Sequence, residues 1–179
     1  VDLSAISAVG ATINLTSTGS ATLIMSNGSS YTDTLLSIES IIGTDSTDQF
    51  KIIGGTGYSL DGGGESDTVD FSGYAIGTNT LTVNLNSSAG SASIMNGATT
   101  VASYTLKNIE NAVGTSQNDY FYMDAKINNV NGGSGTDTAD FSHASAASPV
   151  TVDLSLATAV AVVSGATDTI LLRYNHRDR

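Results

Sequence analysis

An internal repeat constrains the fold of this chain more than any other feature of its sequence. Ile13-Asn14-Leu15 returns as Val83-Asn84-Leu85, and again as Val152-Asp153-Leu154, with a period of about 70 residues. The glycine-rich segment Asp61–Ser72 returns with the same period as Asn131–Ser142. A fixed period is typical of repeat proteins, whose units pack against their neighbours in sequence. We therefore predict a single repeat domain.

The matching segments set the boundaries of the predicted units. The domain covers residues 1–172 and is divided into a partial repeat 1–12, full repeats 13–82 and 83–151, and a partial repeat 152–172. Residues 173–179 form a polar basic tail, which we interpret as a cap, a frayed terminus or a processing edge. No signal peptide begins at Val1, so we expect a matured chain or a domain cut from a longer protein.

The local patterns predict strands. Short apolar runs such as Thr80–Leu85 and Val150–Leu154 are separated by clusters of Gly, Asn, Ser and Asp. No segment shows the 3.6-residue apolar stripe of a helix, so the predicted fold is all-β. A pair of β-sandwich domains, one for each full repeat, is the alternative to a repeat fold.

A second, shorter period favours a solenoid over sandwiches. Asp48 and Asp67 are 19 residues apart in the first repeat, and Asp119 and Asp137 are 18 apart in the second. A glycine before each aspartate and an apolar residue after it recur at the same offsets. Equivalent residues in successive coils of a parallel β-solenoid stack about 4.8 Å apart. We therefore predict a right-handed parallel β-solenoid, of the β-roll or β-helix type, whose coils have these two lengths.

Stacked aspartates require compensation. Two carboxylates about 5 Å apart repel by about 1 kcal/mol in water and about 3 kcal/mol at a surface-like dielectric. The chain has no cysteine and two histidines, so its hard oxygen atoms are the available ligands. Calcium takes six to eight such oxygens from carboxylates and carbonyls. Glycine turns let consecutive carbonyls point into one cavity, so we predict calcium between the stacked turns.

The turn sequences resemble the RTX, or hemolysin-type, calcium-binding repeats, whose motif is G-G-x-G-x-D-x-U-x with U apolar. Asn131–Ala139 matches the fixed positions of that motif, with Ala139 as the apolar residue. Gly62–Val69 matches except at the fourth position, where Glu65 replaces glycine. Ile38–Thr44 and Ile109–Thr115 resemble the lead-in that often precedes such repeats.

The resemblance implies a calcium ion held between two coils at each of two sites. The first site would use Gly43, Asp45 and Asp48 from one turn, and Gly63, Glu65 and Asp67 from the next. The second would use Gly114, Ser116 and Asp119, with Gly133, Gly135 and Asp137. The second set follows the motif more closely, because Glu65 and the longer spacing distort the first.

Other acidic residues allow two interpretations. Asp70 and Asp140 are extra ligands or polar positions in strands. Glu39 and Glu110 are ligands or solvent-facing charges that block edge pairing.

Residues outside the motifs do not form a catalytic set. Phe71 and Phe141 are expected to form a stacked ladder in the core. His143 and His176 lie at positions that do not repeat, so no catalytic triad can be built around them. We predict that the chain is not an enzyme.

Composition excludes several kinds of partner. Six basic against 17 acidic residues give a net charge of −11, which disfavours binding to nucleic acid. No apolar run approaches the roughly 18 residues of a membrane span, so membrane insertion is not expected.

These features favour a structural role outside the cell. We expect a calcium-stabilised segment of a secreted or cell-surface bacterial protein, such as an adhesin, a surface-layer protein or a type I-secreted RTX protein. The alternative is an accessory repeat module of a secreted polysaccharide-active enzyme, such as an alginate epimerase. The expected partners are calcium ions, a cell-surface polysaccharide, and neighbouring repeats of the same protein. The chain is expected to be partly disordered at cytosolic calcium levels and to fold near millimolar calcium.

Overall fold

The computed structural model describes residues 1–5, 10–16, 20–25, 32–86, 89–143, 150–153, 159–163 and 166–171. Within these residues every regular element is a β-strand, which confirms the all-β prediction. The same part of the chain contains no helix long and apolar enough to cross a membrane. The predicted tail at 173–179 lies outside the described residues.

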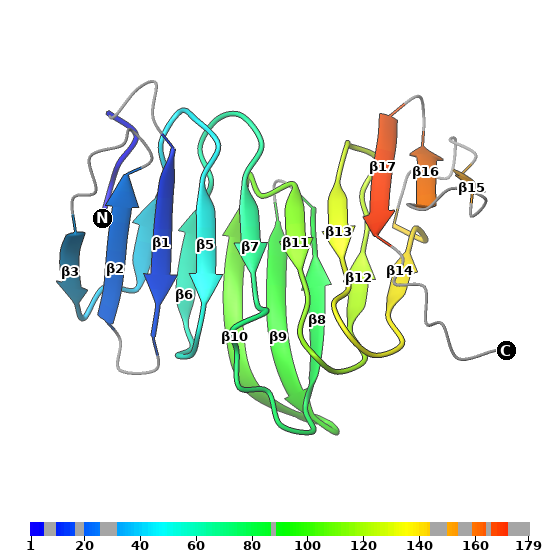
Figure 1. The fold of residues 1–179 in the computed structure, drawn as a ribbon, viewed down its shortest axis with the longest axis horizontal. Helices are drawn as coiled ribbons and strands as arrows, with labels where there is room; N and C mark the ends of the chain where they lie inside the picture. The colour runs from blue at the N-terminus through cyan, green and yellow to red at the C-terminus, as the bar shows by residue number, and fades with distance from the viewer. Residues whose placement is uncertain are drawn as a thin grey trace, which may run out of the picture.

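The described strands form two sheets that lie one behind the other in Figure 1. The ten-stranded sheet contains, in spatial order, β15 (Val150–Asp153), β16 (Ala159–Val163), β17 (Ala166–Leu171), β13 (Asn129–Asn131), β11 (Asn111–Val113), β7 (Thr68–Asp70), β5 (Gln49–Ile52), β1 (Ala11–Leu15), β2 (Ser20–Met25) and β3 (Thr32–Leu36). The seven-stranded sheet contains β14 (Thr138–Asp140), β12 (Tyr120–Tyr122), β8 (Thr80–Asn84), β9 (Gly90–Asn96), β10 (Thr99–Lys107), β6 (Tyr58–Asp61) and β4 (Ser40–Ile42).

Alternation along each strand places the core between the sheets. Successive side chains of a strand point to opposite faces, and in β1 the buried and partly buried positions alternate accordingly. The largest buried side chains therefore include Phe50 and Ile52 of β5, Leu60 of β6 and Phe121 of β12. The intervening positions are mostly Ser, Thr, Asn and Asp, which remain on the outer faces.

The two short offsets predicted from the sequence appear in four parallel strand pairs. In the first repeat, β4 pairs with β6 and β5 with β7, so that Gln49 lies opposite Thr68 one coil later. In the second, β11 pairs with β13 and β12 with β14, so that Asn111 lies opposite Asn129 one coil later. Between these pairs the chain passes from one sheet to the other at each turn.

Antiparallel segments interrupt this pattern, so the sheets are mixed where the sequence analysis expected parallel pairing. Three-stranded meanders are formed by β1–β2–β3, β8–β9–β10 and β15–β16–β17. Their first strands begin at Ala11, Thr80 and Val150, close to the long period of the sequence. The Asn96-Gly97 turn shows the physical reason, because Gly97 has a φ of +59° and reverses the chain within one sheet. Each repeat thus combines one meander with a set of parallel strands.

The expected ladder of Phe71 and Phe141 is not formed. Phe71 follows β7 of the ten-stranded sheet, whereas Phe141 follows β14 of the seven-stranded sheet. Phe71 is fully buried and packs edge-on against Tyr104, with 5.4 Å between ring centroids. Phe141 is only partly buried against the core. The two residues match in sequence but not in position.

Replacing Phe121 by Ala tests the core between the sheets. Phe121 is 1% exposed and lies beside Val83 and Ala139 on the paired strands, so Phe121→Ala should lower the free energy of unfolding by about 3–5 kcal/mol. The exposed Val101 is the control, and Val101→Ala should change it by at most about 0.5 kcal/mol. Urea unfolding measures both changes, and equal losses would contradict the assigned core.

Candidate functional site

The predicted ligand turns lie at the two edges where the chain passes between the sheets (Figure 1). Turns 43–48 and 62–67 lead from the seven-stranded into the ten-stranded sheet. Turns 114–119 and 132–137 lead in the reverse direction and therefore lie at the opposite edge. The two predicted sites are thus on opposite edges of the molecule.

Within each site, a hydrogen bond from the backbone N–H of one aspartate to the carboxylate of the other joins the pair. The Asp48 N–H donates a hydrogen bond of 2.7 Å to Asp67 Oδ1. The Asp119 N–H donates one of 2.9 Å to Asp137 Oδ1. Each carboxylate therefore satisfies the amide of the aspartate one layer earlier. We call this arrangement, in which a turn carboxylate accepts the N–H of the preceding layer, the carboxylate ladder.

The earlier aspartate of each pair accepts hydrogen bonds from the threonine of its own turn. Asp48 accepts the N–H of Thr44 at 2.5 Å and its hydroxyl at 3.1 Å, together with the Ala11 N–H at 2.5 Å. Asp119 accepts the N–H and the hydroxyl of Thr115 at 2.5 and 2.9 Å. In the sequence these threonines were recognised only as the ends of the lead-in segments. The repeated Gly-Thr dipeptide, at the same distance before each aspartate, was the signal for their role.

The later aspartate of the first site lacks such donors. Asp67 is fully buried, and its Oδ2 atom has no hydrogen-bond partner among the described residues. Burial raises the pKa of Asp67 to about 7. The Asp48 N–H opposes this rise, while the charges of Asp48, Glu110 and Asp61 add to it. An unpaired buried carboxylate surrounded by other acids is the arrangement that a bound cation would stabilise.

The second site has the same electrostatic character. Burial raises the pKa of Asp119 to about 6, against the lowering effect of its hydrogen bonds from Thr115, and Asp137 contributes to the rise. Burial also raises the pKa of Asp137. The fold therefore resists the ionisation of Asp67 in the first site and of Asp119 and Asp137 in the second.

Oxygen atoms crowd the glycines of the turns. A Cβ atom at Gly43 would lie 2.3 Å from Asp48 Oδ2 and 2.4 Å from the Gly62 carbonyl oxygen. A Cβ atom at Gly114 would lie 2.3 Å from the Gly132 carbonyl oxygen. Only a residue without a side chain allows the carbonyl of one layer and the carboxylate of another to approach this closely.

Residues 44–173 match the family described as Peptidase M10 serralysin C terminal. The chain belongs to this family. The matched region covers more than half of the chain and includes both pairs of ladder aspartates. No curated protein and no solved structure matches the chain.

The serralysin C-terminal region is of the RTX type and its repeats bind calcium, so the donors must be compared with that ion. Among the described residues, no three acidic, histidine or cysteine side chains gather closely enough to form a metal centre by themselves. The donors present at the turns are carboxylate and backbone carbonyl oxygens, which suit a hard divalent cation. The unpartnered Asp67 Oδ2 and the carbonyls around Gly43 and Gly114 fit such an ion.

Four of the predicted ligands are on the surface. Asp45, Glu65, Ser116 and Gly135 are exposed. Glu65 has a φ of +64°, the left-handed backbone conformation that glycine usually adopts at this motif position. Its backbone thus follows the motif although its side chain departs from it.

Glu110, for which the sequence allowed two roles, lies beside Asp67 of the first site. Glu110 Oε2 accepts the Asp67 N–H at 3.0 Å, which extends the carboxylate ladder by one layer. Asn108, with a φ of +50°, directs its carbonyl oxygen to within 2.1 Å of the Cβ position of Gly62. Glu39, the matching residue of the first repeat, is exposed. The two glutamates therefore differ in role despite their equivalent sequence positions.

Asp70 and Asp140 are positions in strands rather than members of the ladder. Asp70 accepts hydrogen bonds from the Gln49 side chain at 3.2 Å and from the Ser72 N–H at 2.9 Å. Asp140 accepts hydrogen bonds from the Tyr120 hydroxyl and the Ser142 N–H. Both carboxylates have local donors and need no cation.

Stability without divalent cations should fall as the pH rises. The folded chain keeps protons on Asp67 and Asp119 that the unfolded chain releases near the ordinary Asp value of 3.8. In the presence of a chelator, the free energy of unfolding should therefore decrease between about pH 4 and pH 7. Urea unfolding across this range measures it. Asp67→Asn should reduce the dependence of the free energy of unfolding on pH, whereas Asp70→Asn should not. A free energy of unfolding that increases with pH over this range would contradict the assignment.

The glycine-rich turns should not tolerate alanine. Gly133 has a φ of +92°, and a Cβ atom there would lie 2.1 Å from the Thr115 carbonyl oxygen. Gly77 has a φ of +62°, but no atom lies within 4 Å of its Cβ position. Gly77→Ala should therefore cost about 1 kcal/mol for backbone strain alone. Gly133→Ala should cost at least about twice as much by thermal unfolding, and equal costs would show that the turns are not closely stacked.

Proposed function

We propose that this chain is a calcium-binding structural segment of a secreted bacterial protein and has no catalytic role of its own. In this proposal it folds as a right-handed parallel β-solenoid with an antiparallel meander in each repeat. Domains of the serralysin C-terminal family belong to secreted proteins, which supports an extracellular location. An adhesin, a surface-layer protein and a type I-secreted RTX protein are all suitable parents.

The observation that carries this proposal is the unpartnered carboxylate oxygen of Asp67. A buried, unpaired carboxylate costs several kcal/mol unless a charge compensates it. Around it lie the carboxylates of Asp48 and Glu110. The Lys107 ammonium is paired with Asp61 at 2.6 Å, toward the surface. A bound cation would complete the site.

We assign specific residues to the two ions. Asp48 and Asp67, with carbonyl oxygens of the Gly62–Gly64 turn and Asn108, would hold the first, and Glu110 would add a further negative charge near them. Asp119 and Asp137, with carbonyl oxygens of the turns at Gly114 and Gly132–Gly135, would hold the second. Calcium, when bound, supplies positive charge that offsets the repulsion within each carboxylate ladder. The protein supplies the stacking that brings these oxygens together.

Calcium should raise the melting temperature strongly, whereas magnesium should change it little. Magnesium requires a compact octahedral shell and gives up its water reluctantly, while calcium accepts the irregular oxygen set of these turns. At one hundred times its dissociation constant, a single bound ion adds about 2.7 kcal/mol of stability. Circular dichroism melts with chelator, calcium or magnesium measure the effect, and curves that coincide in all three conditions would remove calcium from the proposal.

Matched variants test which residues hold the ion. Asp67→Asn and Asp137→Asn should each weaken calcium binding by calorimetric titration at least about tenfold, because each removes a ladder carboxylate. Asp70→Asn is the matched control, since Asp70 is bonded to Gln49 and Ser72 and should retain wild-type affinity. Equal affinity in all three variants would mean that calcium binds elsewhere.

A further inference from the structure

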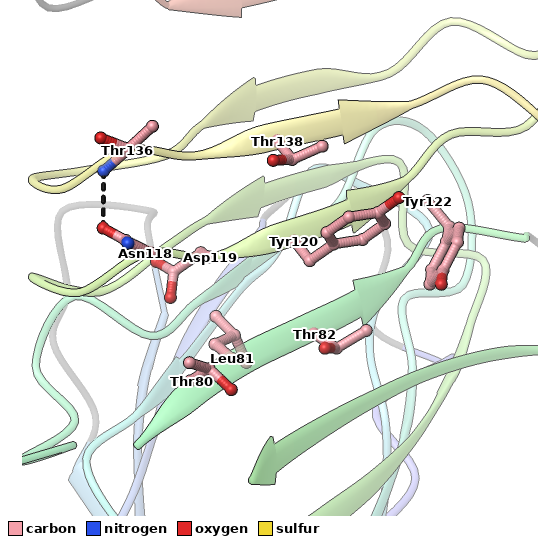
Figure 2. A pocket seen from close by; sticks show the side chains of 9 residues that line it. All are labelled: Thr80, Leu81, Thr82, Asn118, Asp119, Tyr120, Tyr122, Thr136 and Thr138. Atoms are coloured by element: carbon pink, nitrogen blue, oxygen red, sulfur yellow. Dashed lines mark hydrogen bonds between the residues drawn. The ribbon is translucent and has the colours of Figure 1, made fainter. Parts of the chain in front are cut away.

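The outer face of the seven-stranded sheet contains a groove that lies beside the second proposed calcium site and shares Asp119 with it. Its volume is about 440 Å³, and it lies over β8, β12 and β14, as Figure 2 shows. Side chains of these strands line it together with residues of the turns that precede them. Its exposed and partly exposed lining includes Thr80, Thr82, Asn118, Tyr120, Tyr122 and Thr138.

Two tyrosines give the groove an aromatic wall. The rings of Tyr120 and Tyr122 have centroids 4.8 Å apart and are tilted by 54° to each other. Both are only partly buried, although the aromatic residue between them, Phe121, is in the core. The ring of His143 stacks on Tyr122 at 4.7 Å and extends the aromatic surface.

The orientation of Tyr120 is fixed by a charged partner. Its hydroxyl donates a hydrogen bond to Asp140, which raises the pKa of Tyr120 to about 12 and lowers the pKa of Asp140 to about 2. The Asp140 carboxylate also accepts the Ser142 N–H at 2.8 Å. A ring held in place before binding loses little conformational freedom when a ligand stacks on it.

Hydroxyl groups continue from the groove across the sheet. Strand register places Thr138, Tyr120, Thr82, Ser93 and Ser103 in one row that runs perpendicular to the strands. Adjacent strands are about 4.8 Å apart, so a ligand lying along this row would meet a hydroxyl or a tyrosine at each strand. Such a row suits an extended chain that itself carries many hydroxyl groups.

The charge of the groove restricts the ligand. Among the described residues that line it, only Asp119 is acidic and none is basic. Asp119 is 2% exposed and bonded to Thr115, so its charge is not presented to a ligand. The net charge of the chain is −11, which would repel a polyanion. Aromatic faces, hydroxyls and an amide without basic side chains therefore favour a neutral ligand.

We propose that this groove binds a neutral polysaccharide, with Tyr120 and Tyr122 as the stacking surface and Thr82, Thr138 and Asn118 as hydrogen-bonding groups. Polysaccharide was an expected partner from the sequence, but the sequence indicated no site for it. The absence of basic groups in the described groove directs the choice away from acidic polymers such as alginate. The tyrosines and the hydrogen-bonding residues of this proposal are not themselves proposed calcium ligands, so variants at these positions separate polysaccharide binding from calcium binding.

Affinity gel electrophoresis in millimolar calcium tests the proposal with defined probes. Gels would contain a mixed-linkage β-glucan, a galactomannan, an arabinoxylan or the anionic polymer alginate. At least one neutral polymer should retard the wild-type chain, and alginate should not. The chain has no tryptophan and seven tyrosines, so quenching of tyrosine fluorescence would give the affinity for the retarding polymer. Retardation by none of the neutral polymers, or by alginate alone, would overturn the proposal.

Variants localise the binding. Tyr122→Ala should weaken affinity about fivefold or more, because it removes a stacking ring. Thr82→Arg fills the groove without removing a ring and should weaken it similarly, so the test does not rely on one variant. Val101→Ala, on β10 of the same sheet, is the control and should bind as the wild type does. Unchanged polysaccharide binding by Tyr122→Ala and Thr82→Arg would overturn the proposal. A wild-type dimer that Tyr122→Ala dissociates would also overturn it, because a second copy of the chain would then occupy the groove.

Discussion

The hydrogen bond from a backbone amide to the carboxylate of the next layer organises this fold. At the entry to successive strands of the ten-stranded sheet, Ala11 donates to Asp48, Asp48 to Asp67, and Asp67 to Glu110. These amides precede the regular ladder bonds of their strands and would otherwise be left unpaired near the core. Satisfying them with carboxylates sets the register of the layers, and it also concentrates negative charge at the turns. The cation sites that we propose follow from the way the backbone is satisfied.

The two kinds of turn differ in the hydrogen-bond donors that they offer to their own aspartates. Gly-Thr turns carry their own donors, because Thr44 and Thr115 each offer an N–H and a hydroxyl to the aspartate that follows in the same turn. The glycine-rich turn before Asp67 has no threonine in that place, and one oxygen of Asp67 remains unpartnered among the residues that the structure describes. The Gly-Thr turn therefore supplies its aspartate with donors, whereas the turn stacked on it leaves one carboxylate oxygen available. In our proposal, this alternation builds each cation site from a pair of layers rather than from a single loop.

Sequence alone was sufficient for the features that depend on a fixed spacing. The offsets between Asp48 and Asp67 and between Asp119 and Asp137 reappear as strand register, because a parallel stack converts a constant spacing into proximity. The meanders were missed because apolar alternation is the same in parallel and antiparallel strands, and only turns such as Asn96-Gly97 separate the two. Contacts between segments that are far apart in the sequence could not be predicted from spacing. A whole meander separates Glu110 from Asp67 in the chain, so no spacing rule indicated their contact. The groove was also missed, since it requires Tyr120 to lie between Thr82 and Thr138 on strands paired only in the folded chain.

The number of passages between the sheets in each repeat has an additional consequence. From the first strand of one meander to the first strand of the next, the chain changes sheet five times, so β1 and β8 belong to different sheets and β15 returns to the sheet of β1. Because five is odd, equivalent turns of consecutive repeats face opposite sides, and acidic turns are spread over two edges rather than collected on one. Duplication of a single repeat within such an array would exchange the two sides for everything downstream, whereas duplication of a pair would preserve them. The odd number of sheet changes thus favours lengthening of such arrays by two repeats at a time.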